Sequence, residues 1–260
     1  MLADQIAPSF DPALVDVFLR DGFVKLPSVF TAEQIADLGR ALASIQSHES
    51  HGENEQITPD RDLWKRSENV ASFIFQPKIA EIAAALLGAS ATRLIVEVLY
   101  EKVRSTKPTP WHRDSDFWSI SNGAALTMWI PFQDTPNQMA LSYVAGSHRS
   151  SKTRVLRRYE KKLLSLFGST SSFNLRVGDA MVHHYRTLHS SSPYRTETLR
   201  KALAIHVIDA DARPDVARTV FQQGHNQLCG WDRLQAGEGF TDEIAPRLGT
   251  RSLATTINTR

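Results

Sequence analysis

Trp111-His112-Arg113-Asp114 is the stretch of sequence from which the fold of this chain can be inferred. One residue separates His112 from Asp114, and on an extended strand residues i and i+2 point to the same face of the sheet. An imidazole nitrogen and a carboxylate oxygen would therefore project from one strand toward a common point. Both groups bind metal ions, so the stretch predicts one half of a metal site on a β-strand.

The chain around this stretch has the pattern of β-structure from Thr92 onward. Short apolar runs alternate with turn signals, among them Pro108-Thr109-Pro110 and Asn122-Gly123. Several short strands with this punctuation are typical of a sandwich or barrel. The expected strands cover residues 93–103, 124–132, 139–144, 173–177, 179–184 and 199–208.

Helices are expected before the first long strand. Asp11-Pro12 is a helix start signal, and Thr31 with Gln34 fits a capping box that precedes an amphipathic stripe. The expected helices run from residue 12 to Gly22, from 31 to 45 and from 77 to 87, with a short strand over 23–26 and a polar loop, which contains His48 and His51, over 47–69.

This order of elements predicts the fold class. Helices that come first and strands that follow favour an antiparallel sheet with helices on its outside over alternating βαβ units. We therefore expect a mainly β protein with helical decoration, whose jelly-roll core is packed by N-terminal helices. A single domain is expected over residues 1–260, with a helical part over about 11–90, the core over about 92–209 and a tail or lid over 210–260.

The composition is that of an ordinary soluble globular protein. Thirty basic and 28 acidic residues give a net charge of +2 over 260 residues, which lacks the basic excess of a nucleic-acid-binding protein. Cys229 is the only cysteine, so neither an internal disulfide nor a cysteine-based zinc site is expected. No signal peptide and no apolar run of about 20 residues is apparent. We expect a cytoplasmic protein with a small-molecule partner and no nucleic-acid or membrane partner; its oligomeric state is left open.

The metal site needs a third ligand. Late histidines offer one, and His189 is followed by Arg200 after eleven residues, a spacing that predicts Arg200 on the strand beside His189. A buried guanidinium needs an anion, and its geometry suits a carboxylate held by two hydrogen bonds. His184 and Arg195 have the same spacing, but Arg200 lies in an apolar strand and Arg195 in a turn, which favours His189. His183 also competes for this role.

Two histidines and one carboxylate form the facial triad of non-haem Fe(II) oxygenases, which leaves positions for a 2-oxo acid and for dioxygen. The ordered set of Trp111-His112-Arg113-Asp114, Gly146-Ser147-His148, Gly178-Asp179 and His189 with Arg200 resembles the phytanoyl-CoA dioxygenase family. The resemblance spans roughly residues 11–209 and implies a double-stranded β-helix.

The resemblance also implies a chemistry and a set of roles. The family uses Fe(II), 2-oxoglutarate as cosubstrate and O2, and oxidises a small organic molecule by hydroxylation, desaturation, cyclisation or epimerisation. By this likeness His112, Asp114 and His189 are the metal ligands, and Arg200 binds the distal carboxylate of 2-oxoglutarate. It also implies cofactor contacts from Ser191 and Trp118, while Thr127 is a further candidate from its place on an expected strand.

Some positions depart from the family pattern. Gln138-Met139, Ala145 and Tyr194 stand where the family often has Asn-Gly, proline and asparagine, which indicates a divergent substrate pocket. Related halogenases carry Gly or Ala where this chain has Asp114, so oxygen chemistry is favoured over halogenation. Two alternatives are a cupin-like metal isomerase or hydrolase that does not use 2-oxoglutarate, and a degenerate binding protein.

The substrate is not identified by any motif. The resemblance implies a small secondary metabolite. Residues 150–168 predict a basic amphipathic helix, interpreted as a solvated surface in preference to a lid over the site. The residues considered for the substrate pocket are Phe117, Trp118, Phe132, Met139, Tyr143 and Trp231, with Arg104, Lys107, Arg113 and the basic segment as candidates for polar contacts.

Overall fold

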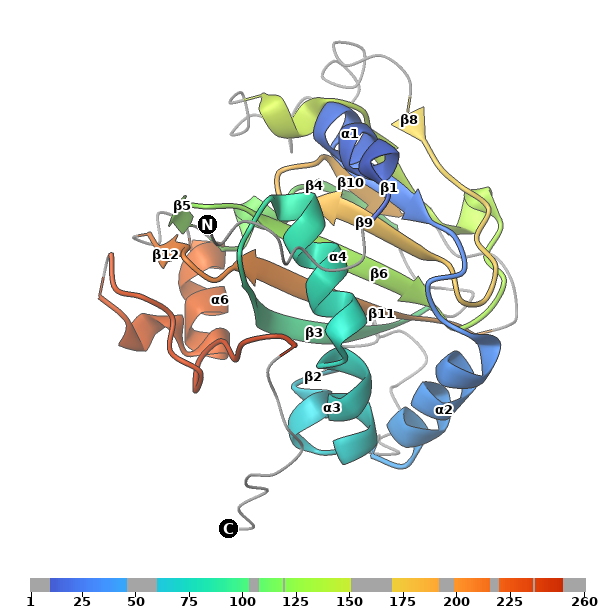
Figure 1. Cartoon of the computed structure of the whole chain (residues 1–260), viewed down its shortest axis with the longest axis horizontal. Helices are drawn as coiled ribbons and strands as arrows, with labels where there is room; N and C mark the ends of the chain where they lie inside the picture. The colour runs from blue at the N-terminus through green and yellow to red at the C-terminus, as the bar shows by residue number, and fades with distance from the viewer. Residues whose placement is uncertain are drawn as a thin grey trace, which may run out of the picture.

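Two antiparallel sheets form the centre of the molecule (Figure 1). The computed structural model describes residues 10–45, 60–102, 108–118, 120–150, 170–191, 199–215, 220–235 and 237–249. The larger sheet has the order β1-β9-β6-β11-β3-β2, the smaller sheet has the order β4-β10-β7-β8, and β12 pairs with β5.

The strands have the following bounds. The larger sheet contains β1 (Phe23–Leu26), β2 (Asp60–Arg61), β3 (Thr92–Lys102), β6 (Ala125–Pro131), β9 (Ala180–His184) and β11 (Arg200–Asp209). The smaller sheet contains β4 (Thr109–His112), β7 (Leu141–Val144), β8 (Thr170–Ser171) and β10 (His189–Ser191), and the remaining pair is β5 (Ile120–Asn122) with β12 (Arg213–Pro214).

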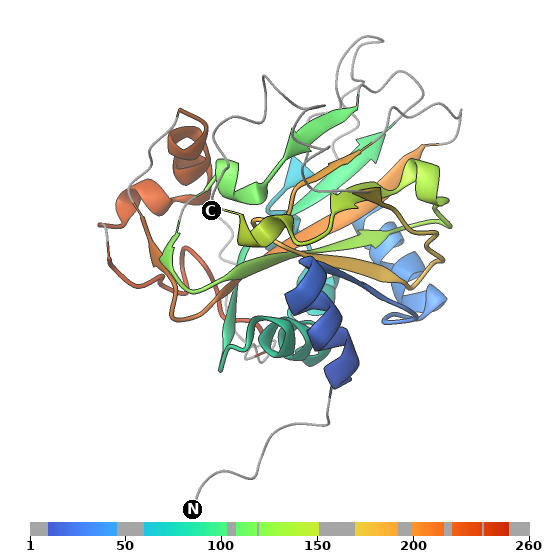
Figure 2. The same ribbon diagram turned by 90° about the horizontal axis from the view of Figure 1, so that it is seen from above.

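The helices lie outside these sheets. The α-helices are α1 (Pro12–Asp21), α2 (Ala32–Ala43), α3 (Glu68–Ile74), α4 (Pro77–Leu87) and α6 (Val220–Cys229). Short 3-10 helices are η1 (Leu63–Lys65), η2 (Asp114–Asp116), η3 (Asn137–Met139), η4 (Ser147–Arg149) and η5 (Trp231–Arg233). Figure 2 shows α1 and α4 on one side of the larger sheet and β4 on the other.

Local sequence explains where the helices begin and end. Asp11 accepts a hydrogen bond from the Ala13 backbone N–H, and Gly22 closes α1 with φ of 83°. The capping box at the start of α2 is present. The Thr31 hydroxyl accepts a hydrogen bond from the Gln34 backbone N–H, and the Gln34 side-chain oxygen accepts one from the Thr31 backbone N–H. These predicted helix boundaries are confirmed.

Alternation along the strands gives the larger sheet two different faces. On β11, Leu203, Ile205 and Val207 belong to the apolar core that α2, α3 and α4 cover. The residues that alternate with them, including Ala202 and Ala204, belong to the opposite face, toward the smaller sheet. Because side chains alternate along a strand, one face of the sheet carries the main core and the other faces the cavity.

One apolar helical stretch, Glu68–Leu87, has the length and hydropathy of a membrane span, with a mean hydropathy of 1.5. It consists of two helices, α3 and α4, which are interrupted between Ile74 and Pro77. Val70 and Ile79 are fully buried in the same core. The apolar character of this stretch is thus accounted for by packing against the sheet.

Some sequence-based predictions were wrong or partly wrong. Residues 173–177 do not form a strand; Leu175 makes only an isolated bridge with Thr135. Residues 137–139 are a 3-10 helix, so the strand expected over 139–144 begins at Leu141. The expected loop over 47–69 contains β2, η1 and the start of α3, which pair or pack locally with β3 and α2.

Other predictions lie outside the described residues. They concern His48 and His51, nearly all of the basic segment 150–168, and the positions Arg104, Lys107, Tyr194 and Arg195. That residues 1–260 form one domain stays a prediction.

Candidate active site

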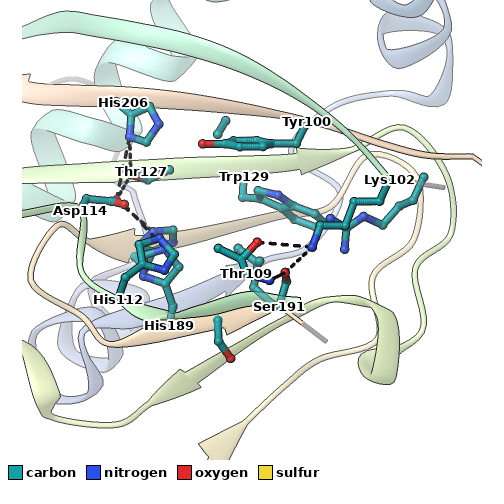
Figure 3. Close-up of a pocket in the computed structure, with 15 residues that line it drawn as sticks. Tyr100, Lys102, Thr109, His112, Asp114, Thr127, Trp129, His189, Ser191 and His206 are labelled. Carbon is teal, nitrogen blue, oxygen red and sulfur yellow. Dashed lines mark hydrogen bonds and ion pairs between the residues drawn. The ribbon is translucent and has the colours of Figure 1, made fainter. Parts of the chain in front are cut away.

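The candidate site lies between the two sheets, where a row of side chains from each sheet meets. In the smaller sheet, His189 on β10 lies directly opposite His112 on β4. In the larger sheet, Thr127 on β6 lies between His206 on β11 and His183 on β9. The described lining of the cavity is Tyr100, Lys102, Thr109, His112, Asp114, Thr127, Trp129, Leu141, His183, His189, Ser190, Ser191, Arg200, Ala204 and His206 (Figure 3).

His112, Asp114 and His189 converge at one end of this cavity. One potential ligand atom from each of the three lies within 4.8 Å of the others. Asp114 and His189 are buried, and His112 is half-buried. This is the set of two imidazoles and one carboxylate that suits a non-haem Fe(II) centre.

Hydrogen bonds define the tautomers of the two histidines. His112 Nδ1 lies 2.8 Å from the Pro110 carbonyl oxygen, and His189 Nδ1 lies 3.0 Å from the Thr187 carbonyl oxygen. A carbonyl only accepts, so Nδ1 carries a proton in both rings, and in the neutral form of each ring the lone pair is on Nε2. An Nδ1–H bonded to a backbone carbonyl is the usual support of a metal-binding histidine.

The Asp114 carboxylate has one restrained and one available oxygen. Thr127 Oγ1 donates to Oδ2 at 2.6 Å, and His183 Nε2 lies 3.3 Å from the same oxygen. Oδ1 is 3.6 Å from His189 Nε2. His206 Nδ1 lies 2.9 Å from Thr127 Oγ1 and extends this contact to the neighbouring strand β11. The carboxylate is thus oriented with Oδ1 toward the histidine pair.

The protonation states also suit a metal. Burial, together with neighbouring His112 and His183, holds the pKa of His189 well below its usual value, so the ring is neutral at pH 7. Burial alone would raise the pKa of Asp114, but His189, His183 and His206 outweigh it and hold that pKa well below its usual range. A neutral imidazole beside an ionised carboxylate is the form that binds a cation.

The route by which His112 and Asp114 converge differs from the prediction. The strand β4 ends at His112, and Asp114 is the first residue of η2. Arg113, between them, is fully buried and points away, donating to the carbonyl oxygens of Ser147 at 2.9 Å and Ser150 at 3.0 Å. The turn after the strand, held by Arg113, therefore brings the two ligands together.

Arg200 lies at the other end of the cavity, but not on the strand beside His189. It begins β11 in the larger sheet, whereas His189 is on β10 in the smaller sheet. The prediction of neighbouring strands was wrong because the chain changes sheets between these residues. Arg200 is buried, its guanidinium lies 5.5 Å above the Trp129 ring, and Nη1 donates to the Met139 carbonyl oxygen at 2.6 Å.

The remaining predicted cofactor contacts fall in different places. Ser191 lines the Arg200 end of the cavity, and Thr127 lines the other end and supports Asp114. Trp118 is absent from the described lining; it is buried against Tyr185, with ring centroids 5.2 Å apart, and against Trp231. The turn of η2 directs Trp118 toward the C-terminal residues, which argues against a cofactor contact.

The rival histidines occupy other positions. His183 faces Asp114 from the larger sheet and does not belong to the converging group among the described residues. His184, the next residue on β9, points to the opposite face, where its ring lies 5.4 Å from that of His148. The geometry therefore supports His189 as the third ligand.

Residues missed from the sequence complete the lining. Lys102, Tyr100 and Trp129 alternate with core residues on β3 and β6, which is the signal that could have placed them on the cavity face. The side chains predicted to line the substrate pocket are not found in the described lining of the cavity. The described lining includes none of Phe117, Trp118, Phe132, Met139, Tyr143 and Trp231, although the Phe117 ring lies 5.6 Å from that of His112.

Fold and site together define a class: a jelly-roll oxygenase whose cavity has a two-histidine, one-carboxylate group at one end and a buried arginine at the other. The phytanoyl-CoA dioxygenase (PhyH) family model matches residues 18–202. The chain belongs to this family and is an Fe(II)- and 2-oxoglutarate-dependent dioxygenase. Family membership disfavours an isomerase or hydrolase that works without 2-oxoglutarate.

Similar proteins have related activities. A probable alpha-ketoglutarate-dependent hypophosphite dioxygenase from Stutzerimonas stutzeri is 27% identical over 226 residues, which cover 76% of this chain and 78% of that protein. The carbocyclase SnoK from nogalamycin biosynthesis is 25% identical, with a TM-score of 0.75 over 92% of this chain and 96% of SnoK. The epimerase SnoN, solved with Fe3+, alpha-ketoglutarate and nogalamycin RO, is 27% identical, with a TM-score of 0.72 over 91% of this chain and 99% of SnoN.

Proposed function

We propose that His112, Asp114 and His189 hold the Fe(II) of this dioxygenase and that Arg200 anchors the distal carboxylate of 2-oxoglutarate. The observation that carries this assignment is the convergence of three ligand atoms within 4.8 Å. The two Nδ1–H groups are engaged by backbone carbonyls, so the Nε2 atoms are the ones available to a metal.

When bound with 2-oxoglutarate and O2, Fe(II) couples the decarboxylation of the cosubstrate to the oxidation of an organic substrate. The protein contributes position and a dry environment. Thr127 donates to Oδ2 of Asp114, and His183 Nε2 lies 3.3 Å from the same oxygen, which leaves Oδ1 as the atom available to the metal. Arg200 supplies a fixed positive charge at the opposite end of the cavity, where a dicarboxylate can be held lengthwise.

The substrate we propose is a small organic molecule, of the kind modified in secondary metabolism. Relatives that act in nogalamycin biosynthesis support this, since SnoK is a carbocyclase and SnoN an epimerase. The carboxylate of Asp114 favours oxygen chemistry over halogenation. The reaction on the substrate would be hydroxylation, desaturation, cyclisation or epimerisation.

We further propose that the enzyme works in the cytoplasm. Cys229 is the only cysteine, and proteins without disulfides are typical of reducing compartments. Cell fractionation with an antibody to the protein tests the location; recovery in the membrane or extracellular fraction would contradict it.

The role of the site is tested by succinate formation from 2-oxoglutarate with Fe(II) and O2. Wild type is expected to form succinate slowly without substrate and faster with an accepted one. His112→Ala and Arg200→Ala should reduce the rate at least a hundredfold, about 2.7 kcal/mol in barrier terms. Equal rates in wild type and both variants, or no binding of 2-oxoglutarate to the Fe(II) form, would contradict the assignment.

A further inference from the structure

His206 on β11 and Tyr100 on β3 are polar residues of the cavity that the proposed ligand set does not include. On β11 the lining residues run from Arg200 through Ala204 to His206, which places His206 at the end of the cavity away from Arg200. Figure 3 shows His206 beside Asp114, and the Tyr100 ring along the cavity with its hydroxyl directed toward that end. We call this part of the cavity the His206–Tyr100 corner.

The hydrogen bonds of Thr127 determine which nitrogen of His206 carries the proton. Thr127 Oγ1 has one proton and donates it to Asp114 Oδ2 at 2.6 Å. In the 2.9 Å contact between Thr127 Oγ1 and His206 Nδ1, the donor must therefore be Nδ1–H. Asp114 Oδ2, another acceptor, lies 3.9 Å from the same nitrogen, which favours the same tautomer.

The other nitrogen of His206 is an unused acceptor. His206 is 8% exposed, and burial lowers its pKa to about 4, so the ring is neutral at pH 7 and Nε2 carries a lone pair. Among the residues that the structure describes, none donates a hydrogen bond to Nε2. A buried acceptor that lines a cavity without a donor has room for one from a bound molecule.

The Tyr100 hydroxyl is the second unused polar group of the corner. Burial raises the pKa of Tyr100 to about 12, so the hydroxyl keeps its proton at pH 7. It makes no hydrogen bond within the described part of the chain, and it can both donate and accept. Ala204, two residues before His206 on the same face of β11, contributes only a methyl group to the lining between them.

These two groups together suit one kind of ligand group. A carboxylate or a ketone only accepts and cannot pair with Nε2, which excludes the acceptor groups of 2-oxoglutarate. An ammonium group only donates and would leave the Tyr100 proton without an acceptor. A hydroxyl can donate to His206 Nε2 and accept from Tyr100 Oη at the same time, so neither polar group is left unpaired, which would be costly in a buried site.

We propose that His206 and Tyr100 bind a hydroxyl group of the substrate beside the metal ligands, and that they thereby select an alcohol as the substrate. This inference rests on the proposed metal site, which it deepens by naming a class of substrate. It makes both residues specificity determinants. Through Thr127, the same His206 ring also supports the orientation of Asp114, so the bound hydroxyl lies one side chain away from a proposed metal ligand.

The test is NMR of protein labelled with ¹⁵N-histidine and loaded with 2-oxoglutarate and Zn(II), a diamagnetic substitute for Fe(II). The probes are 2-propanol and acetone, which have nearly the same shape, although only 2-propanol donates a hydrogen bond. 2-Propanol should move the resonance of the unprotonated Nε2 of His206 to lower frequency in a saturable manner, and acetone should leave it in place. The absence of this resonance in His206→Phe assigns it.

Two tyrosine variants test the other half of the corner. Tyr100→Phe should weaken the apparent affinity for 2-propanol about three- to tenfold, the range for one neutral hydrogen bond. Tyr185→Phe is the matched control: this tyrosine is also partly buried but lies outside the described lining, so the affinity should stay at the wild-type value. Equal affinities in the two variants would overturn the role of Tyr100.

The remaining outcomes separate this inference from the metal assignment. A His206 ring that carries its proton on Nε2, no response to 2-propanol, or an equal response to acetone would overturn the inference and leave the metal site intact. Zn(II) should shift the Nε2 resonances of His112 and His189, and the absence of that shift would overturn the metal assignment itself. Thermal unfolding identifies a fold defect in a variant, in which case 2-propanol against acetone on wild type decides.

Discussion

The carboxylate of Asp114, the proposed metal ligand, is oriented by the residues around it. Thr127 binds Oδ2, and the same hydroxyl contacts His206 on the next strand. Because Thr127 lies in register with both His206 and His183, these three side chains form a row beside the Asp114 carboxylate. Such outer contacts orient a ligand and commonly affect metal affinity.

Removing the Thr127 hydroxyl tests this support. Thr127→Val keeps the shape of the side chain but removes its donor, so Asp114 can rotate and Co(II) binding should weaken about tenfold. Competition with a chromophoric chelator measures the affinity. Thr135→Val is the control, since Thr135 is equally buried but donates to the Gln133 carbonyl oxygen outside the site. Equal affinities in the two variants would contradict the role of Thr127.

At the scale of elements, the turn before β9 depends on a glycine. Gly178 has φ of +94°, and a Cβ there would lie 2.2 Å from the Phe30 carbonyl oxygen. The Phe30 backbone N–H also donates to the Gly178 carbonyl at 3.0 Å. The close approach of these two segments fixes the start of β9, which carries His183.

Two alanine substitutions separate backbone strain from steric overlap. Gly88 also has a positive φ, +63°, but a Cβ there meets nothing within 4 Å. Gly88→Ala should cost about 1 kcal/mol of unfolding free energy for the left-handed conformation alone. Gly178→Ala adds the clash with Phe30 and should cost roughly 2 kcal/mol more. Urea unfolding measures both, and similar losses would show that the close approach can relax.

At the scale of the whole molecule, a buried acid links stability to pH. Glu97 on β3 is fully buried and accepts from the Trp64 backbone N–H at 3.0 Å. Burial raises its pKa from 4.5 to about 7. Between these values the folded protein binds more protons at Glu97 than the unfolded chain does. The contribution of Glu97 protonation to the free energy of unfolding is therefore fully present below pH 4.5, and it is lost as the pH rises through 7.

Glu97→Gln removes this titration. Wild type loses up to about 1.4 kcal/mol of unfolding free energy for each pH unit between the two pKa values. The unfolding free energy of the variant relative to that of wild type should therefore be roughly 2–3 kcal/mol higher at pH 8 than at pH 5. Urea unfolding of both proteins at the two pH values gives the difference, in which the contributions of the other groups cancel. A difference that does not change with pH would contradict the raised pKa of Glu97.

A metal ion should stabilise the whole fold through the same thermodynamic linkage. A ligand whose free concentration is a hundred times its dissociation constant raises the free energy of unfolding by about 2.7 kcal/mol if it binds only the folded state. For a chain of this size that corresponds to a rise in melting temperature of about 5–10 °C. The rise should appear with Co(II), reverse with a chelator and be absent in His112→Ala. A similar rise in that variant would place the metal elsewhere.

The sequence by itself determined the class of this protein. His112 with Asp114, and His189 with Arg200, are recognisable because the spacing within each pair is short. The long strands and the caps of α1 and α2 also follow from local patterns, since alternation and capping act over a few residues. Short strands such as β5 and β8 lack enough residues to show a period, and they were missed.

Only the tertiary structure decided which residues meet across strands. The row of His183, Thr127 and His206 and the pair of Lys102 with Arg200 come from segments that are far apart in the sequence. Alternation assigns a side chain to a face of its strand, but the partner strand and the register are set by packing of the whole core. For the same reason Arg200 faces the site from the sheet opposite His189, a position that the spacing of eleven residues could not reveal.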